Sequence, residues 1–179
     1  MKKVIFTAIL AIATAVSVNA QWKVGANLGL QVPTGTFGDV SGTGFGLAAN
    51  GEYLATENIG IGAQLGYYSF GEKESGSGSW SIVPITVTGK YYFMTEGLKP
   101  YAGLDLGFYS LSYEVDLGIL GANVSTSETK FGLAPVVGLQ YDFSDNWALD
   151  ANLKYNYITT SGDAVTSFGI NVGVVYSIK

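Results

Sequence analysis

Large apolar residues alternate with small or polar residues along most of the chain from residue 21 onward. In the last segment, Phe168 to Ile178, even positions are large and apolar, whereas odd positions hold Gly, Asn, Val or Ser. A period of two is typical of a β-strand whose two faces meet different surroundings. The alternation predicts eight strands, which are centred on residues 22–32, 45–53, 59–67, 83–93, 102–108, 131–143, 147–157 and 168–178.

The connections between these segments alternate in length. Long or polar connections cover residues 33–43, 71–81, 117–129 and 161–166, and short ones lie around residues 56–58, 95–99 and 144–146. An even number of strands with long loops at one end and tight turns at the other is typical of outer-membrane barrels. The sequence therefore predicts an all-β fold, an eight-stranded antiparallel up-and-down transmembrane β-barrel. Both termini then lie at the short-turn end, which we expect to be periplasmic.

The composition of the two faces favours a membrane barrel over a soluble one. A lipocalin-like soluble barrel would also alternate, with its apolar face inward. Its outer face would then need many Lys and Glu residues for solubility and protection of strand edges. Here the polar face carries mainly glycine, threonine and asparagine. Small side chains fit the narrow interior of an eight-stranded barrel, so we expect the apolar face to contact lipid.

Three places depart from simple alternation. Pro84 and Pro135 lie inside predicted strands, and since proline cannot donate a backbone hydrogen bond, each predicts a bulge or a missing bond. After Phe108 the apolar positions change parity and continue at Tyr109 and Leu111. We interpret this change as a bulge, or as a strand that continues beyond the membrane.

Aromatic residues gather at both ends of the predicted strands. Amphipathic rings prefer the bilayer interfaces, so we expect two aromatic girdles. The girdle near the short turns comprises Trp22, Tyr53, Tyr91, Phe93, Tyr141, Phe143, Trp147 and Tyr176, and the girdle near the long loops comprises Tyr67, Phe131, Tyr155, Tyr157 and Phe168. The ten steps from Trp147 to Tyr157 rise about 25 Å at a tilt of about 40°, which matches the apolar band of a membrane barrel.

Inward-facing charged and amide residues are few, and we expect them to pair with one another because burying a single charge is costly. The predicted polar network of the lumen comprises Lys23, Glu52, Lys90, Asp105, Gln140, Asp142, Asp150 and Lys154. A turn that places Met94 opposite Tyr101 would set Lys90 directly across from Asp105, which predicts a contact between these two. We interpret the network as a plug; a path for protons or ions is the alternative.

Residues 1–20 have the pattern of a cleaved, helical signal peptide that precedes a barrel domain over residues 21–179. Lys2 and Lys3 are followed by an apolar run over residues 4–16 and by the small-residue site Val18-Asn19-Ala20. The apolar run is shorter than the roughly 20 residues that a transmembrane helix needs. The sequence contains no cysteine, which disfavours a lipid anchor at the cut.

Charge and residue types exclude several classes of function. Removing Lys2 and Lys3 leaves seven lysines against fourteen carboxylates, a net charge of −7, and the sequence has no arginine. Nucleic-acid binding is therefore disfavoured. Without histidine or cysteine, we expect no metal site, no cofactor and no enzyme activity. A lipid-modifying barrel enzyme would need a base to activate its serine, and no histidine is present to act as one.

Strand number, loop alternation and the terminal strand Gly169–Ile178 together resemble the small eight-stranded outer-membrane proteins of Gram-negative bacteria. This family includes the OmpA transmembrane domain and OmpX, with OmpW as a more distant relative. The resemblance implies that the terminal strand is read by the barrel-assembly machinery, and that the chain is a monomer surrounded by outer-membrane lipid and lipopolysaccharide. It implies a structural or surface-interaction role in envelope integrity or adhesion, with host or surface ligands at the loops. An OmpW-like narrow channel for small or apolar molecules is the alternative.

Overall fold

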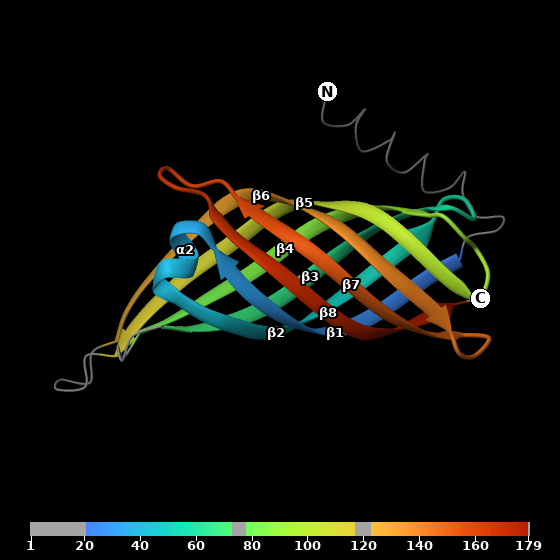
Figure 1. The fold of residues 1–179 in the computed structure, drawn as a ribbon, viewed down its shortest axis with the longest axis horizontal. Coiled ribbons are helices and arrows are strands. Elements are labelled where there is room, and N and C mark those ends of the chain that lie inside the picture. Colours follow the sequence, from blue (N-terminus) through green and yellow to red (C-terminus); the bar gives the residue numbers. More distant parts are fainter. Residues whose placement is uncertain (1–20, 73–77, 117–122, 179) are drawn as a thin grey trace, which may run out of the picture.

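The computed structural model describes residues 21–72, 78–116 and 123–178, so the predicted signal peptide lies outside the described residues. Within them, eight antiparallel strands form a closed barrel in which each strand pairs with the next and β8 closes on β1 (Figure 1). The predicted all-β, up-and-down barrel is confirmed. Trp22 pairs with Ile178, so the first and last strands meet at the end that carries the short turns.

The strands extend beyond the apolar segments that predicted them. They are β1 (Gln21–Thr34), β2 (Ser41–Leu54), β3 (Ile59–Glu72), β4 (Gly78–Tyr92), β5 (Leu98–Asp116), β6 (Asn123–Asp142), β7 (Trp147–Ile158) and β8 (Val165–Ile178). A six-residue helix, α2 (Gly35–Val40), lies between β1 and β2. No helix among the described residues is both long and apolar enough to span a membrane.

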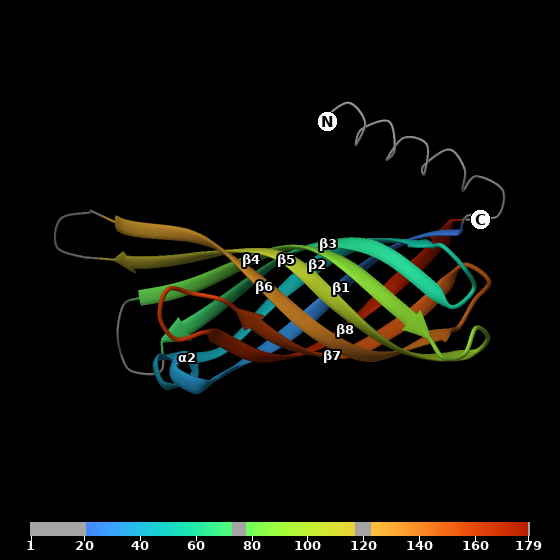
Figure 2. The same ribbon diagram turned by 90° about the horizontal axis from the view of Figure 1, so that it is seen from above.

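In two of the predicted long connections the residues that the structure describes are strand, which corrects the extent of these connections. β3 continues to Glu72 and β4 begins at Gly78, while β6 begins at Asn123. Residues 123–131 of β6 pair with β5 but not with β7, whose pairing with β6 begins at Gly132. We call residues 67–72, 78–83, 110–116 and 123–129 the protruding sheet. Figure 2 shows that β5 and β6 reach farthest from the end of the barrel where β1 begins and β8 ends.

The outward face of the barrel is apolar and exposed. Along β7, Trp147 and Leu153 are exposed whereas Asp150 and Lys154 are buried. Leu28 and Phe45 are 71% and 70% exposed, and exposed apolar side chains continue around every strand. A soluble monomer rarely exposes a continuous apolar surface of this extent. The soluble barrel with an inward apolar face is therefore contradicted, because the large apolar side chains lie outside the barrel wall and do not fill the barrel interior.

Both prolines interrupt a ladder without changing its register. Around Pro84, β3 and β4 pair at Leu65 with Ile85 and again, in the same register, at Tyr68 with Ile82. Pro135 lies in a similar gap between β6 and β7. Of the two predicted outcomes, a missing bond rather than a bulge is observed, since proline has no backbone N–H to donate.

The change of parity after Phe108 is a change of face and not a bulge. β5 keeps one register with β4 and with β6 as far as its paired residues extend. Phe108 is 59% exposed on the outside, whereas the next residue, Tyr109, is 3% exposed and lies inside. The strand therefore continues, as the second interpretation expected, and its apolar side chains now point into the barrel.

The turn between β4 and β5 corrects the predicted register by two residues. Tyr92, not Met94, pairs with Tyr101, so Lys90 lies opposite Gly103 and Asp105 opposite Thr88. The turn closes through a bond from the Phe93 amide to the Pro100 carbonyl (2.9 Å), and Gly97 within it has φ of 64°. Glycine is favoured there because this left-handed conformation brings a Cβ too close to the following carbonyl.

We expect Gly97→Ala to lower the free energy of unfolding by about 1–2 kcal/mol because the new Cβ strains the left-handed backbone. Gly89→Ala is the matched control. Neither glycine has a neighbouring atom within 4 Å of its virtual Cβ, but only Gly97 has positive φ. Urea unfolding in lipid vesicles measures both, and equal losses would contradict the assignment of strain to Gly97.

Candidate functional site

The lumen near the termini is closed by an ion pair that is bonded to a tyrosine. Lys90 of β4 lies 2.6 Å from Oε2 of Glu52 on β2, and the Tyr92 hydroxyl donates to Oε1 of the same carboxylate at 2.6 Å. Lys23 donates to Oε1 of Gln140 at 2.9 Å. All these groups lie inside the wall because they occupy inward positions of their strands, so each charge in this layer has a bonded partner.

The next layer is built around Asp150. The Tyr101 hydroxyl donates to both Asp150 oxygens, at 3.1 and 3.0 Å, and Asn152 donates to Oδ1 at 2.8 Å. Asn171 then donates to Asn152 at 2.9 Å, which extends the network to β8. Lys90 also lies 5.0 Å from the centroid of the Tyr101 ring, within range of a cation–π interaction, so the two layers contact each other.

A second ion pair lies further from the termini. Lys154 of β7 lies 2.5 Å from Oδ2 of Asp105 on β5 and donates to Gln64 at 2.6 Å. Oδ1 of Asp105 and the hydroxyl of Thr86 are buried and have no hydrogen-bond partner among the described residues. These two atoms are the polar groups that an internal water would satisfy.

Both ion pairs reach over an intervening strand. Lys90 pairs with Gly60 of β3 and reaches past it to Glu52 on β2. In the same way, Asp105 pairs with Ala134 of β6 and reaches Lys154 on β7. A small residue on the strand between leaves room for the two long side chains to meet above it.

The structure places most of the predicted network inside the barrel, with one member at the mouth. Asp142 pairs with Lys99 at 2.5 Å near the short turns, where its side chain is 36% exposed. The predicted contact between Lys90 and Asp105 is wrong, because the register shift gives each another partner. Sequence reasoning missed Gln64, Tyr92, Tyr101, Asn152 and Asn171 as network members, although the alternation within each strand already gave their inward parity.

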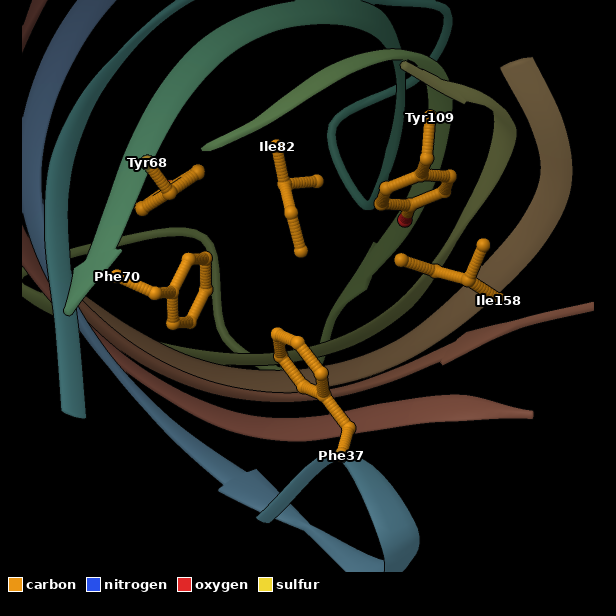
Figure 3. Close-up of a cluster of buried hydrophobic side chains, with 6 residues drawn as sticks. All are labelled: Phe37, Tyr68, Phe70, Ile82, Tyr109 and Ile158. Atoms are coloured by element: carbon orange, nitrogen blue, oxygen red, sulfur yellow. The ribbon is translucent and has the colours of Figure 1, made fainter. Parts of the chain in front are cut away.

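The loop end of the lumen is filled by an apolar cluster that the sequence reading did not anticipate. Its buried members, shown in Figure 3, are Phe37, Tyr68, Phe70, Ile82, Tyr109 and Ile158. Phe37 comes from α2 and packs edge-on against Phe70, with a centroid distance of 5.4 Å. The helix thereby lays one aromatic ring over the barrel mouth. The change of parity after Phe108 was the available signal.

Inward glycines provide space for the large rings of the lumen. A Cβ at Gly138 would lie 2.5 Å from Cζ of Tyr101, and one at Gly44 would lie 2.4 Å from Cδ1 of Phe70. A real side chain at either position would have to displace the ring. The glycine-rich face therefore does more than line a narrow interior, because it accommodates the aromatic side chains that fill it.

Two small cavities lie between these layers. One cavity of about 30 Å³ lies among the polar residues, and another of about 20 Å³ lies beneath the apolar cluster. Gln64, Asp105 and Lys154 line both cavities. Since one water needs at least about 10–15 Å³, each cavity has room for only one or two waters. Across the described residues, no three carboxylates gather as a metal-binding group.

The residues of the predicted girdles all lie on the outward face, most of them well exposed. Several pair across strands, such as Trp22 with Tyr53 at 5.2 Å and Trp147 with Tyr176 at 5.0 Å between centroids. Tyr155 and Phe168, at the opposite end of their strands, are 4.8 Å apart. Aromatic pairs thus occur near both ends of the apolar surface.

Comparisons with known proteins give one consistent fold. A family model described as "Outer membrane protein beta-barrel domain" matches residues 4–177. An uncharacterized protein of Haemophilus influenzae is 24% identical, with 99% of each chain covered. The crystal structure of Neisserial surface protein A is 24% identical, covers 89% of this chain and 99% of its own, and gives a TM-score of 0.70. Ail, the attachment invasion locus protein of Yersinia pestis, in complex with the heparin analogue sucrose octasulfate, is 18% identical, with 90% and 100% covered and a TM-score of 0.63.

We expect Lys154→Met to lower the free energy of unfolding by about 3–5 kcal/mol, because it leaves the Asp105 carboxylate buried without its cation. The double variant Asp105→Asn/Lys154→Met should recover most of this loss. Lys130→Met is the matched control, since it removes a lysine from an ion pair whose Glu128 is exposed and should cost less than about 1 kcal/mol. Urea unfolding in vesicles compares the three, and an equal loss for both single variants would contradict the role of the buried pair.

Proposed function

Because the chain belongs to the outer membrane protein β-barrel domain family, we propose that it is a closed scaffold with a structural or surface-interaction role. It lies in the cell outer membrane, where its exposed apolar face contacts lipid. The barrel holds its loops and the protruding sheet in fixed positions. Envelope integrity and adhesion are the roles that such a scaffold would serve.

The observation that carries this proposal is the filled lumen. Ion pairs and tyrosines occupy the terminal end, and an aromatic cluster covered by α2 occupies the loop end. The two cavities between them have volumes of about 30 and 20 Å³. A conduit for solutes needs a continuous path, and each of these cavities has room for only one or two waters. Filling therefore supports a scaffold over the narrow channel that is the alternative.

The surface-interaction part of the proposal rests on the end of the barrel opposite the termini. There, in the protruding sheet, β5 and β6 continue to pair beyond the point where the pairing of β6 with β7 ends. Two similar structures are, by their descriptions, a surface protein and an attachment protein. We extend that kind of role to this chain, with host or surface ligands at the loops, outer-membrane lipid and lipopolysaccharide around the wall, and no dependence on oligomerisation. Insertion would depend on the barrel-assembly machinery.

The proposed orientation places both termini and the short turns in the periplasm. The start of β1 and the end of β8 pair at the short-turn end, and α2 and the connection between β7 and β8 lie at the other end (Figure 1). Outer-membrane barrels have short periplasmic turns and longer external loops. We assign no catalytic role, because the sequence lacks the histidine and cysteine on which the usual nucleophilic sites depend.

In planar bilayers we expect the folded chain to show no steady single-channel conductance, because the lumen is filled. Tyr92→Ala/Phe70→Ala removes one buried ring from each filled end of the lumen and should produce measurable openings. Tyr91→Ala/Tyr141→Ala is the matched control, since it removes two exposed rings from the outside and should stay silent. Steady openings of the unaltered chain would favour the channel instead.

Single cysteines test the orientation, because the sequence has no cysteine of its own. Gly162→Cys lies in the exposed connection between β7 and β8, and Asp145→Cys lies in the exposed turn between β6 and β7. On intact cells, a membrane-impermeant maleimide should label Gly162→Cys, and it should label Asp145→Cys only after the outer membrane is opened. The reverse result would invert the proposed orientation.

A further inference from the structure

The outward face of β3 to β6 changes from apolar to hydroxyl-bearing within four residues along each strand. One row of directly paired residues crosses the four strands in the apolar part, namely Leu65, Ile85, Phe108 and Phe131. Four residues farther from the termini, the same register aligns four serines, Ser69, Ser81, Ser112 and Ser127. At about 3.3 Å per residue, the two rows are only about 13 Å apart along the strands.

We call the residues of this second surface the hydroxyl band: Ser69, Ser81, Ser110, Ser112, Ser127 and Thr129. Ser110 and Thr129 pair with each other between the serine row and the apolar row, two residues from the serine row. Directly paired residues share a face of a sheet, and all six have the parity of the outward apolar residues, so their hydroxyls point outward. Ser127 and Thr129 are exposed and the others are half-buried.

The hydroxyl band has hydrogen-bonding capacity that the described residues do not use. Ser127 bonds with Ser112 at 3.2 Å and with Ser110 at 3.3 Å. The side chains of Ser69, Ser81 and Thr129 make no hydrogen bond to any described residue. A hydroxyl offers one donor and two acceptor positions, so donors and acceptors lie side by side across four strands. A ligand of matching chemistry must itself present both kinds of group.

We propose that the hydroxyl band binds the sugar headgroups of the surrounding outer-leaflet glycolipid. The band continues the lipid-facing surface beyond the apolar row, where acyl tails give way to headgroups. Sugars present hydroxyls that both donate and accept, as the band does. The inference rests on the orientation proposed above, which places the protruding sheet on the outer side.

The charge of the surface favours sugar over phosphate as the recognised group. Phosphate recognition in proteins relies on Arg and Lys, and the sequence has no arginine. The nearest lysine in sequence, Lys130, has inward parity and is paired with Glu128 at 2.9 Å. The band itself carries no charge, so its contacts with a headgroup would be neutral hydrogen bonds.

The test is an NMR titration of the folded, isotope-labelled chain in detergent micelles with core oligosaccharide freed of its lipid. We expect amide shifts centred on the hydroxyl band. Ser69→Ala/Ser81→Ala should weaken binding about tenfold, because two hydroxyls are lost. These hydroxyls make no hydrogen bond to the described protein, so the variant should keep the heat-modifiable gel migration of the folded barrel. Ser144→Ala/Ser161→Ala is the matched control and should bind as the unaltered chain does.

Absence of shifts, shifts centred elsewhere, or equal weakening by the two double variants would each overturn the proposal. Shifts produced by an extended peptide but not by the oligosaccharide would assign the surface to a protein partner, and would overturn it as well. Both ends of the barrel are accessible in micelles, so this titration does not depend on orientation. Maleimide labelling on cells and conductance in bilayers, in contrast, test the proposed function. A failure of the proposed function can therefore be distinguished from a failure of the sugar-binding proposal.

Discussion

Closure of the backbone ladder is the constraint on which the rest of this structure depends. A bilayer core offers no water, so every strand edge inside it must be paired, and only a complete ring of strands leaves no edge open. The pairing of β1 with β8 over thirteen residue pairs supplies that closure. Once the ring is closed with eight strands, its interior is just wide enough to be filled by side chains. The apolar exterior and the crowded lumen are both consequences of this geometry.

The narrow lumen is filled by two kinds of side-chain packing. Near the termini, charged groups neutralise one another across a strand that carries a small residue, as at Gly60 beneath Lys90 and Glu52. Toward the loops, apolar rings replace ion pairs, and α2 adds Phe37 to them. Among the described residues, the buried charges of the lumen have bonded partners; a buried charge without one would be strongly destabilising. Two of the remaining unsatisfied atoms, Asp105 Oδ1 and the Thr86 hydroxyl, belong to residues that line a cavity large enough for water.

The parts of the fold that the sequence predicted are those in which lipid acts on one face of a strand. From Trp147 to Tyr157, apolar and polar positions alternate strictly because one face meets acyl tails and the other the lumen. Beyond the apolar surface, lipid no longer selects apolar residues on the outward face, so the Ser- and Thr-rich ends of β4 and β6 were not predicted as strand. The register at Gly97 was missed for another reason. A shift of two residues keeps every side chain on its own face, so only turn geometry distinguishes the alternatives.

The candidate site was predictable as a set of inward residues and not as a set of pairs. Parity placed Lys90, Glu52, Asp105 and Lys154 inside, whereas the pairing between them crosses an intervening strand and depends on which residue of that strand is small. The apolar cluster was visible only as an irregularity after Phe108.

The pairing between β1 and β8 has a consequence for the assembly of the barrel. It joins the first and last strands of the barrel, so the ring cannot close until all eight strands have been synthesised, and the strand edges stay open until β8 reaches β1.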